Sequence, residues 1–402
     1  MRWLLGWRSN RERRARALGA VLGTLVFLGW FATVLYWSER HEASDGEASR
    51  LAAVAALEPV VLAVAADGLD QLSMHDQRAR LSGAANEPAL LALFGAWAKL
   101  SLGRAGLLEP TTCARLPWLL LGALSPLLLY RALRARRGAL VAGTGAAALG
   151  FLWLRAASGS AAWDGSHHLG WLMLVVTPYL ATLQRAASTR RRQCSAVLAA
   201  LTLAIALALS QSALWVAFIC ALHLPLARWT SARQLACSGR FPLPSFLFLG
   251  LPLAAPSLVL LNPQLWQATA VQIAAFVLGP VGASSAVSAQ VPTLEGVLHV
   301  PGVIAIGALL GVACDAALAR TRRATARAGV VPEGPATLLA LIAVGLVVTL
   351  LLPWAFPPQL AGLRPPREYS LPFWAMGLGL AAGAIRDFAR RLRCVAKSQI
   401  SP

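Results

Sequence analysis

The sequence has few charged residues, and acidic residues are the scarcest of them. Only 13% of its 402 residues are charged, whereas 57% are hydrophobic. Soluble domains carry about 25% charged and roughly 45–50% apolar residues, so this composition disfavours a water-soluble globular chain. Seventeen Asp and Glu stand against 36 Lys and Arg, which leaves a formal net charge of +19. Lys99 and Lys397 are the only lysines, so nearly all of the positive charge is arginine.

The six cysteines form no Cys-x-x-Cys pair. Their spacing therefore indicates neither a zinc site nor a dithiol redox motif, and it does not indicate a disulfide framework. They lie in or near apolar runs, where a thiol behaves as a small hydrophobic group. The chain also lacks a glycine-rich or aromatic module beside its basic clusters. The positive charge is therefore not evidence for nucleic-acid binding.

What the chain does have is a series of long apolar runs. Only helices and closed barrels satisfy their backbone polar groups in lipid, and these Leu/Ala-rich runs lack the alternation of barrel strands. The sequence predicts an all-α polytopic protein, one integral membrane domain over residues 1–402, with about ten transmembrane helices. The predicted spans are Ala17–Trp37, Leu116–Leu133, Gly138–Leu154, Leu169–Leu183, Ala196–Ser210, Ala213–Leu226, Pro244–Leu261, Leu298–Leu318, Ala336–Leu352 and Leu371–Ile385.

Charge predicts the orientation of these spans. With the N-terminus inside, 26 of the 36 basic residues but only 4 of the 17 acidic residues fall on the cytoplasmic side. Cytoplasmic loops of membrane proteins carry this excess of arginine and lysine. The first apolar run is too long for the core of a cleaved signal peptide, so we expect an uncleaved first span. Both termini are then cytoplasmic. The bias toward Arg, Ala and Leu indicates a bacterial cytoplasmic (inner) membrane.

One apolar run does not fit the alternation. Residues Pro88–Leu102 lie inside the predicted first outer loop, 38–115, and contain Lys99. If this run crossed the membrane, every later basic cluster would lie outside. We therefore predict a helix that lies in the membrane interface.

Ionisable residues gather in three segments on the predicted outer side: the first loop, the turn before Leu169, and the turn before Leu371. Five of the six histidines also fall on this side; the sixth, His223, is predicted to be a packed residue near the cytoplasmic end of its span. Loops held by a rigid helical frame often carry functional residues. The candidates are Asp45, Glu47, Asp164, His167, His168, Arg364 and Arg367.

Several short motifs occur in a recognisable order. Asp45-Gly-Glu47 follows the first span, then come Asn86-Glu-Pro88 and Arg115-Leu-Pro117, and Asp164 follows the third span. Arg367-Glu-Tyr-Ser-Leu-Pro372 opens the last span. This order resembles the GT-C glycosyltransferases that use polyprenyl-phosphate sugars, the group of protein O-mannosyltransferases and lipid A aminoarabinose transferases.

The resemblance implies a GT-C-like fold and an inverting transfer of sugar to a lipid, glycan or protein acceptor. A lipid phosphate leaves as an anion, so the reaction needs a base for the acceptor hydroxyl but no acid for the leaving group. The resemblance nominates Asp45 as that base, with Glu47 second because Gly46 separates the two acids. Asp164 would orient the acceptor or a metal ion.

The remaining roles follow from the phosphate and from the histidines. Arginines suit a phosphate on which charge develops, and the resemblance nominates Arg364, Arg367 and Arg115. His167 and His168 are the candidate ligands of a divalent metal ion. Successive residues on a helix point about 100° apart, so both could reach one ion only with the help of loop backbone.

Two other functional classes remain open. A lipid or polysaccharide flippase or transporter would be a membrane protein of similar composition, but it would need ionisable groups or broken helices at mid-membrane. A non-catalytic or polymerase-type glycan-assembly protein would keep the outer arginines without needing Asp45. In every case the partners expected are the bilayer and a lipid-linked substrate, not nucleic acid.

Overall fold

The computed structural model describes thirteen stretches of the chain, and all of their regular elements are helical. They are residues 21, 23–25, 27–36, 38, 45–68, 89–157, 166–183, 189–210, 212–235, 245–262, 336–355, and 365 with 367–400. No strand occurs within these residues. The prediction of an all-α chain is therefore confirmed for this part of the protein.

Helices coincide with every predicted span except Leu298–Leu318, which lies outside the described residues. Between residues 21 and 38 the described positions are helical. The further elements are α2 (Asp45–Asp67), α4 (Ala89–Ala98), η2 (Lys99–Gly103), α5 (Pro110–Arg137), α6 (Ala139–Ala157), α7 (Ser166–Thr182), α8 (Thr189–Leu209), α9 (Ala213–Leu235), α10 (Ser245–Leu261), α14 (Ala336–Leu346), η5 (Val347–Leu351), α15 (Leu352–Ala355), η7 (Arg367–Tyr369) and α16 (Ser370–Ile400).

By length and composition, two of the described helices are long and apolar enough to cross a membrane. They are Pro110–Arg134 within α5 and Arg192–Leu209 within α8. Shorter apolar helical stretches of 10–17 residues occur in α4, α6, α7, α9, α10 and α14, and between residues 23 and 36.

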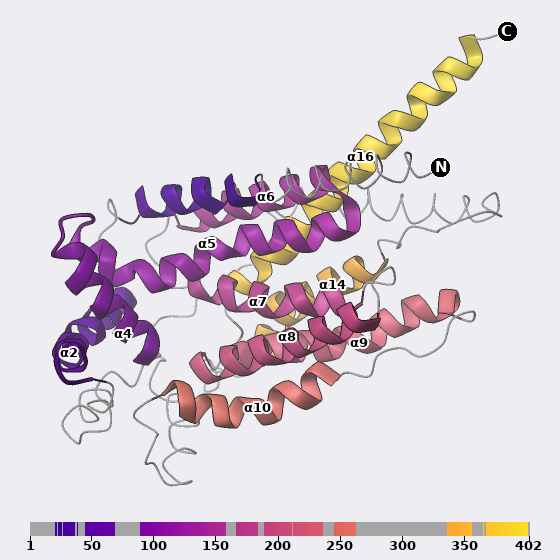
Figure 1. Cartoon of the computed structure of the whole chain (residues 1–402). Helices are drawn as coiled ribbons and strands as arrows, with labels where there is room; N and C mark the ends of the chain where they lie inside the picture. Colours follow the sequence, from indigo (N-terminus) through magenta and orange to yellow (C-terminus); the bar gives the residue numbers. More distant parts are fainter. Residues whose placement is uncertain are drawn as a thin grey trace, which may run out of the picture.

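The helices form a bundle in which neighbours along the chain are mostly neighbours in space. α5 packs against α6 and α7, α8 lies between α7 and α10, and α14 contacts α9 and α16. α16 packs along α6. α2 and α4 gather at one end of the bundle, whereas α16 runs out beyond the opposite end (Figure 1).

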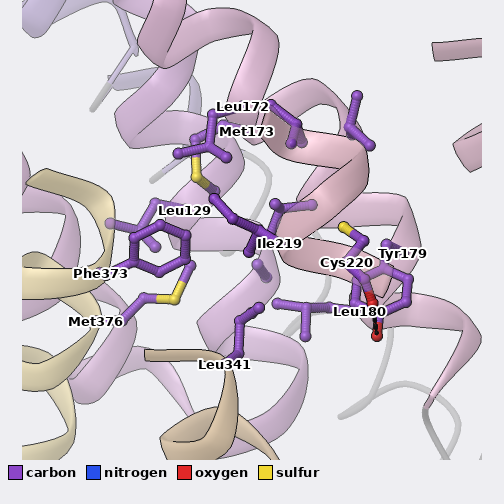
Figure 2. Close-up of a cluster of buried hydrophobic side chains, with 14 of the residues drawn as sticks. Leu129, Leu172, Met173, Tyr179, Leu180, Ile219, Cys220, Leu341, Phe373 and Met376 are labelled. Atoms are coloured by element: carbon purple, nitrogen blue, oxygen red, sulfur yellow. Dashed lines mark hydrogen bonds between the residues drawn. The ribbon is translucent and has the colours of Figure 1, made fainter. Parts of the chain in front are cut away.

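The core is built from the Leu/Ala-rich faces that the sequence offers. Figure 2 shows side chains from five helices meeting at its centre, among them Leu129, Met173, Ile219, Leu341 and Phe373. Each of the five is fully buried. These apolar contacts join the central helices whether the outer surface of the bundle faces water or lipid.

Two glycines let helices approach at backbone distance. A Cβ at position 170 in α7 would overlap the carbonyl oxygen of Leu121 in α5. A Cβ at position 379 in α16 would lie 2.6 Å from the carbonyl oxygen of Val141 in α6. Small residues at such crossings are typical of helices that associate through close packing. Gly170 follows His168 by two residues, so it sets the position of the start of α7.

The segment predicted as an interfacial helix is helical from Ala89 to Gly103. Its last turn, η2, has π-helical hydrogen bonding, a local widening that is frequent near functional sites. Lys99 in this turn donates a 2.6 Å hydrogen bond to Glu58 of α2. α2 and α4 also share a small apolar cluster with Trp118 of α5. The interfacial position of this helix stays a prediction.

Candidate active site

Three segments that are distant in sequence meet where α7, α9 and α16 begin. His168 is in the first turn of α7, Ser210 follows α8, Ser212 precedes α9, and Tyr369 ends η7 just before α16. When neighbouring helices run in opposite directions, the end of one lies beside the start of the next. Hydrogen bonds between these four residues show that they also come into contact.

Ser212 is the centre of this cluster. Its Oγ lies 2.9 Å from Nδ1 of His168, 3.0 Å from the hydroxyl of Tyr369 and 2.7 Å from Oγ of Ser210. A hydroxyl donates one hydrogen bond and accepts two, so Ser212 can satisfy all three partners at once. The His168 and Tyr369 rings also pack edge to face, with centroids 5.9 Å apart. The four residues therefore form one connected network.

The network is uncharged at neutral pH. Desolvation in this packed environment, and then the positive charge of Arg50, hold the pKa of His168 far below its usual value. Burial raises the pKa of Tyr369 well above the usual value for a phenol. Both side chains therefore offer neutral hydrogen-bonding groups rather than charges. Lowering the pKa of His168 also makes its imidazole a weak base, which disfavours a Ser–His hydrolase in which His168 would activate Ser212.

Arg50 of α2 is close enough to His168 for its positive charge to lower the pKa of His168. Asp45 and Glu47 lie in the first turn of α2, and Arg50 follows Glu47 by three residues. At a rise of about 1.5 Å per residue, Asp45 lies about 7–8 Å along the helix axis from Arg50. The side chains of Asp45 and Glu47 are not described, so their approach to the network stays a prediction. Acidic residues in the first turn of a helix also favour the helix dipole, and that structural role needs no active site.

The late arginine motif reaches the same place. Arg367 begins η7, two residues before Tyr369, and its backbone is described while its side chain is not. His167 likewise is placed only by the backbone of α7. Asp164 and Arg364 lie outside the described residues. The structure therefore brings η7, which carries Arg367, to the start of α7 at His168.

Arg115 has a described role in packing. Its guanidinium Nη1 donates to the carbonyl oxygen of Ser38, at the end of the first helical segment. A cation at the C-terminal end of a helix stabilises the exposed carbonyls there. One turn further along α5, Leu119 packs with Leu169 and close to Leu371. Arg115 therefore lies near the starts of α7 and α16, and its predicted contact with phosphate stays a prediction.

Metal ligands do not cluster within the described part of the chain. No group of three His, Cys, Asp or Glu side chains there is arranged to hold an ion. Asp164 and the side chain of His167, two of the residues considered for a metal, are not among those described. The divalent metal remains a prediction about the turn before α7.

A second polar cluster lies at the other end of α7. His223 is fully buried; its Nδ1 lies 2.7 Å from the hydroxyl of Tyr179, and its Nε2 lies 2.9 Å from the carbonyl oxygen of Thr337. Because a carbonyl only accepts, Nε2 carries the proton and Nδ1 accepts from Tyr179. These contacts tie α7, α9 and α14 together. They confirm that His223 is a packed residue.

Sequence reasoning missed Ser210 and Ser212. Both lie in the short break between α8 and α9, where the predicted span Ala196–Ser210 ends and the span Ala213–Leu226 begins. The signal that was present is the polar triplet Ser210-Gln-Ser212 between two apolar helices. Only the fold shows that this turn contacts His168 and Tyr369.

No protein-family model, curated protein or solved structure matches the chain.

Proposed function

We propose that this chain is an integral membrane glycosyltransferase. It moves a sugar from a polyprenyl-phosphate donor to a lipid, glycan or protein acceptor on the outer face of the bacterial cytoplasmic membrane. The main support is the hydrogen-bonded cluster of His168, Ser212 and Tyr369 at helix ends, which η7 approaches with Arg367. Arg50 of α2 is close enough to lower the pKa of His168.

Exposed apolar stripes on two helices support the proposal that the chain lies in a membrane. α9 presents Leu214, Phe218, Leu222 and Leu226 at four-residue spacing, each 40–57% exposed. α8 presents a similar stripe, from Val197 to Ile205. A soluble monomer rarely leaves long contiguous apolar faces in water, whereas lipid-facing helices require them. Acyl chains are therefore the occupant we propose for these stripes.

The distribution of basic residues supports the sidedness. α5 leaves the network end near Arg115 and finishes with Arg134, Arg136 and Arg137. α8 carries Arg190, Arg191 and Arg192 in its first turn and finishes at Leu209, next to Ser210. The two helices run in opposite directions relative to the network, yet both are basic at the end away from it. The positive-inside rule then makes the basic ends cytoplasmic and the network extracytoplasmic.

The chemistry of the network suits a phosphate-bearing donor. His168 and Ser212 are neutral and partly exposed, so they can hydrogen-bond phosphate oxygens without the cost of burying a charge, and Tyr369 holds Ser212 in place. η7 carries Arg367 into the same region, and an arginine there would neutralise the phosphate as it leaves. The first turn of α2 supplies Asp45 and Glu47. One of these would accept the acceptor's proton as the anomeric carbon becomes electron-poor.

Native mass spectrometry tests whether the chain binds the proposed donor. The chain, purified in mild detergent, should retain a mass corresponding to a polyprenyl phosphate or its sugar ester. Added polyprenyl phosphate should compete for the same site, whereas a dialkyl phosphate of ordinary phospholipid length should not. A chain that binds neither, under conditions in which it remains folded, would contradict the proposal.

Cysteine labelling tests the orientation. Single cysteines placed at positions 134 and 164, in a background without the native cysteines, should react with an impermeant reagent from opposite sides of the membrane. Labelling of both from one side would show that the scheme of ten spans is wrong. A cysteine at 191 is the matched control and should behave as position 134 does.

A further inference from the structure

The last part of α16 has a surface that the proposed transfer reaction does not use. α16 is helical to Ile400, and its close packing ends near Gly383, where a Cβ would lie 2.6 Å from a side-chain carbon of Val141. Beyond that point the helix runs out of the bundle (Figure 1). Ile385 is 68% exposed and Phe388 is 55% exposed, so two large apolar side chains face outward just after the bundle ends.

In the helical register, the apolar residues of segment 385–400 fall on the same side as Ile385 and Phe388. Ile385, Phe388, Ala389 and Leu392 occur at i, i+3, i+4 and i+7, and Val395 and Ala396 continue the same side. Residues with this spacing share one face of a helix. The segment also contains five basic residues and a single acid, Asp387, which pairs with Arg386. In the register, Arg391 and Arg393 fall at opposite edges of the apolar face.

We propose that residues 385–400 of α16 form an amphipathic docking helix for anionic phospholipids at the cytoplasmic membrane surface. An apolar face flanked by cations fits acyl chains bordered by negatively charged headgroups. The segment leaves the bundle at the basic end, where α5 finishes and α8 starts, so one membrane surface would meet all of these cations. An acidic protein would match the charge, but it would not explain an apolar face at the level where a bilayer would end. This inference rests on the proposed membrane embedding, but not on the transfer reaction.

The test uses the full chain reconstituted in vesicles of phosphatidylcholine, with or without phosphatidylglycerol. An environment-sensitive fluorophore is placed at Ala389→Cys in a background without the native cysteines. With phosphatidylglycerol, the label should be quenched by nitroxide lipids and shielded from aqueous iodide. In phosphatidylcholine alone, or at high salt, the label should become accessible to iodide, because screening weakens attraction to the surface.

Two matched variants test the charge. Each cation near an anionic surface contributes about fivefold to binding, so Arg391→Gln with Arg393→Gln should reduce the docked-to-free ratio about 25-fold. Arg391→Lys with Arg393→Lys keeps the charge and should dock like the parent chain. Phe388→Ser should also release the helix, through loss of its apolar contact.

Two failures are distinguishable. If the chain does not float with vesicles of either composition, the membrane embedding itself is wrong. If the chain floats but the label is equally exposed in both lipids, or the Gln and Lys variants behave alike, the docking helix is overturned while the proposed enzyme stands. Shielding that persists in phosphatidylcholine alone and depends on protein concentration would identify a second copy as the occupant, and would also overturn the proposal.

Discussion

The role of Ser212 in the network can be tested by substituting it alone and together with its partner Tyr369. Ser212→Ala deletes the oxygen that His168, Ser210 and Tyr369 share. The three partners differ in whether water can replace the lost hydrogen bond. His168 and Ser210 are partly exposed and can recruit water, but Tyr369 is 0% exposed and its hydroxyl has only Ser212 as a described partner. Ser212→Ala should therefore leave one buried hydroxyl unpaired.

The size of the effect follows from that difference. A typical hydrogen bond contributes about 0.5–1.5 kcal/mol, and an unpaired buried polar group costs about 1–3 kcal/mol. Tyr369→Phe removes one bond and leaves nothing buried unpaired, so it should cost about 1 kcal/mol. Ser212→Ala should cost about 2–4 kcal/mol. In the double variant the penalty for the unpaired hydroxyl disappears, which predicts a coupling of about 1–2 kcal/mol between the two sites.

The assay is equilibrium unfolding by denaturant in detergent micelles, followed by far-ultraviolet circular dichroism. Tyr130→Phe is the matched control, because the Tyr130 hydroxyl is buried without a hydrogen-bond partner in the described structure. Its removal should leave the free energy of unfolding unchanged or raise it. Additive effects of Ser212→Ala and Tyr369→Phe, with no coupling, would refute the network.

Three further predictions follow from single contacts. Gly170→Ala should lower the free energy of unfolding by about 1–3 kcal/mol, because its methyl group overlaps the Leu121 carbonyl; Gly143→Ala, where nothing lies nearby, is the control, and equal effects of the two would contradict the close approach. Glu58→Gln should cost no more than about 1 kcal/mol, since its ion pair with Lys99 is partly exposed; a loss of several kcal/mol in the same unfolding assay would show that the pair is more important than its exposure implies. Arg367→Ala should raise the Kd for polyprenyl phosphate measured by native mass spectrometry while leaving unfolding unchanged, and unaltered binding would remove Arg367 from the donor site.

The positions of the helices could be predicted from the sequence because an apolar run of this length has few alternatives. The runs at Leu116–Leu133 and Leu169–Leu183 lie within or nearly within α5 and α7, which extend beyond them by a few residues. Charged and polar residues at helix ends do not interrupt a helix, so hydropathy underestimates its length. α2 was not located for a related reason. Its sequence is rich in alanine, which favours a helix. Pro59 and several charged residues interrupt the apolar pattern, so the segment was predicted to be a loop.

The candidate site could be predicted only in part. The motifs located the starts of α2, α7 and α16, because each motif lies at a helix end on one side of the predicted topology. The structure brings the starts of α7 and α16 together. Ser212 and Arg50 were missed since a single serine or arginine in a turn or helix carries no pattern. Their contacts depend on which helix ends become neighbours, and that is decided by the packing of α5, α7, α9 and α16. Arg115 is the opposite case. Its motif marked it as a candidate residue, but the sequence did not reveal its hydrogen bond to the carbonyl oxygen of Ser38.

In the proposed reaction, a carboxylate in the first turn of α2 acts as the base of the sugar transfer. The most direct measurement is single-turnover transfer from a labelled polyprenyl-phosphate sugar, by the full chain in proteoliposomes, for the parent, Asp45→Asn and Glu47→Gln. A general base is typically worth 10²–10⁴-fold in rate, about 3–5 kcal/mol of barrier. We predict that Asp45→Asn loses this factor while donor binding, measured separately, stays within about threefold of the parent. A slow Glu47→Gln beside a normal Asp45→Asn would move the base by two residues, whereas parental turnover in both variants would contradict the claim.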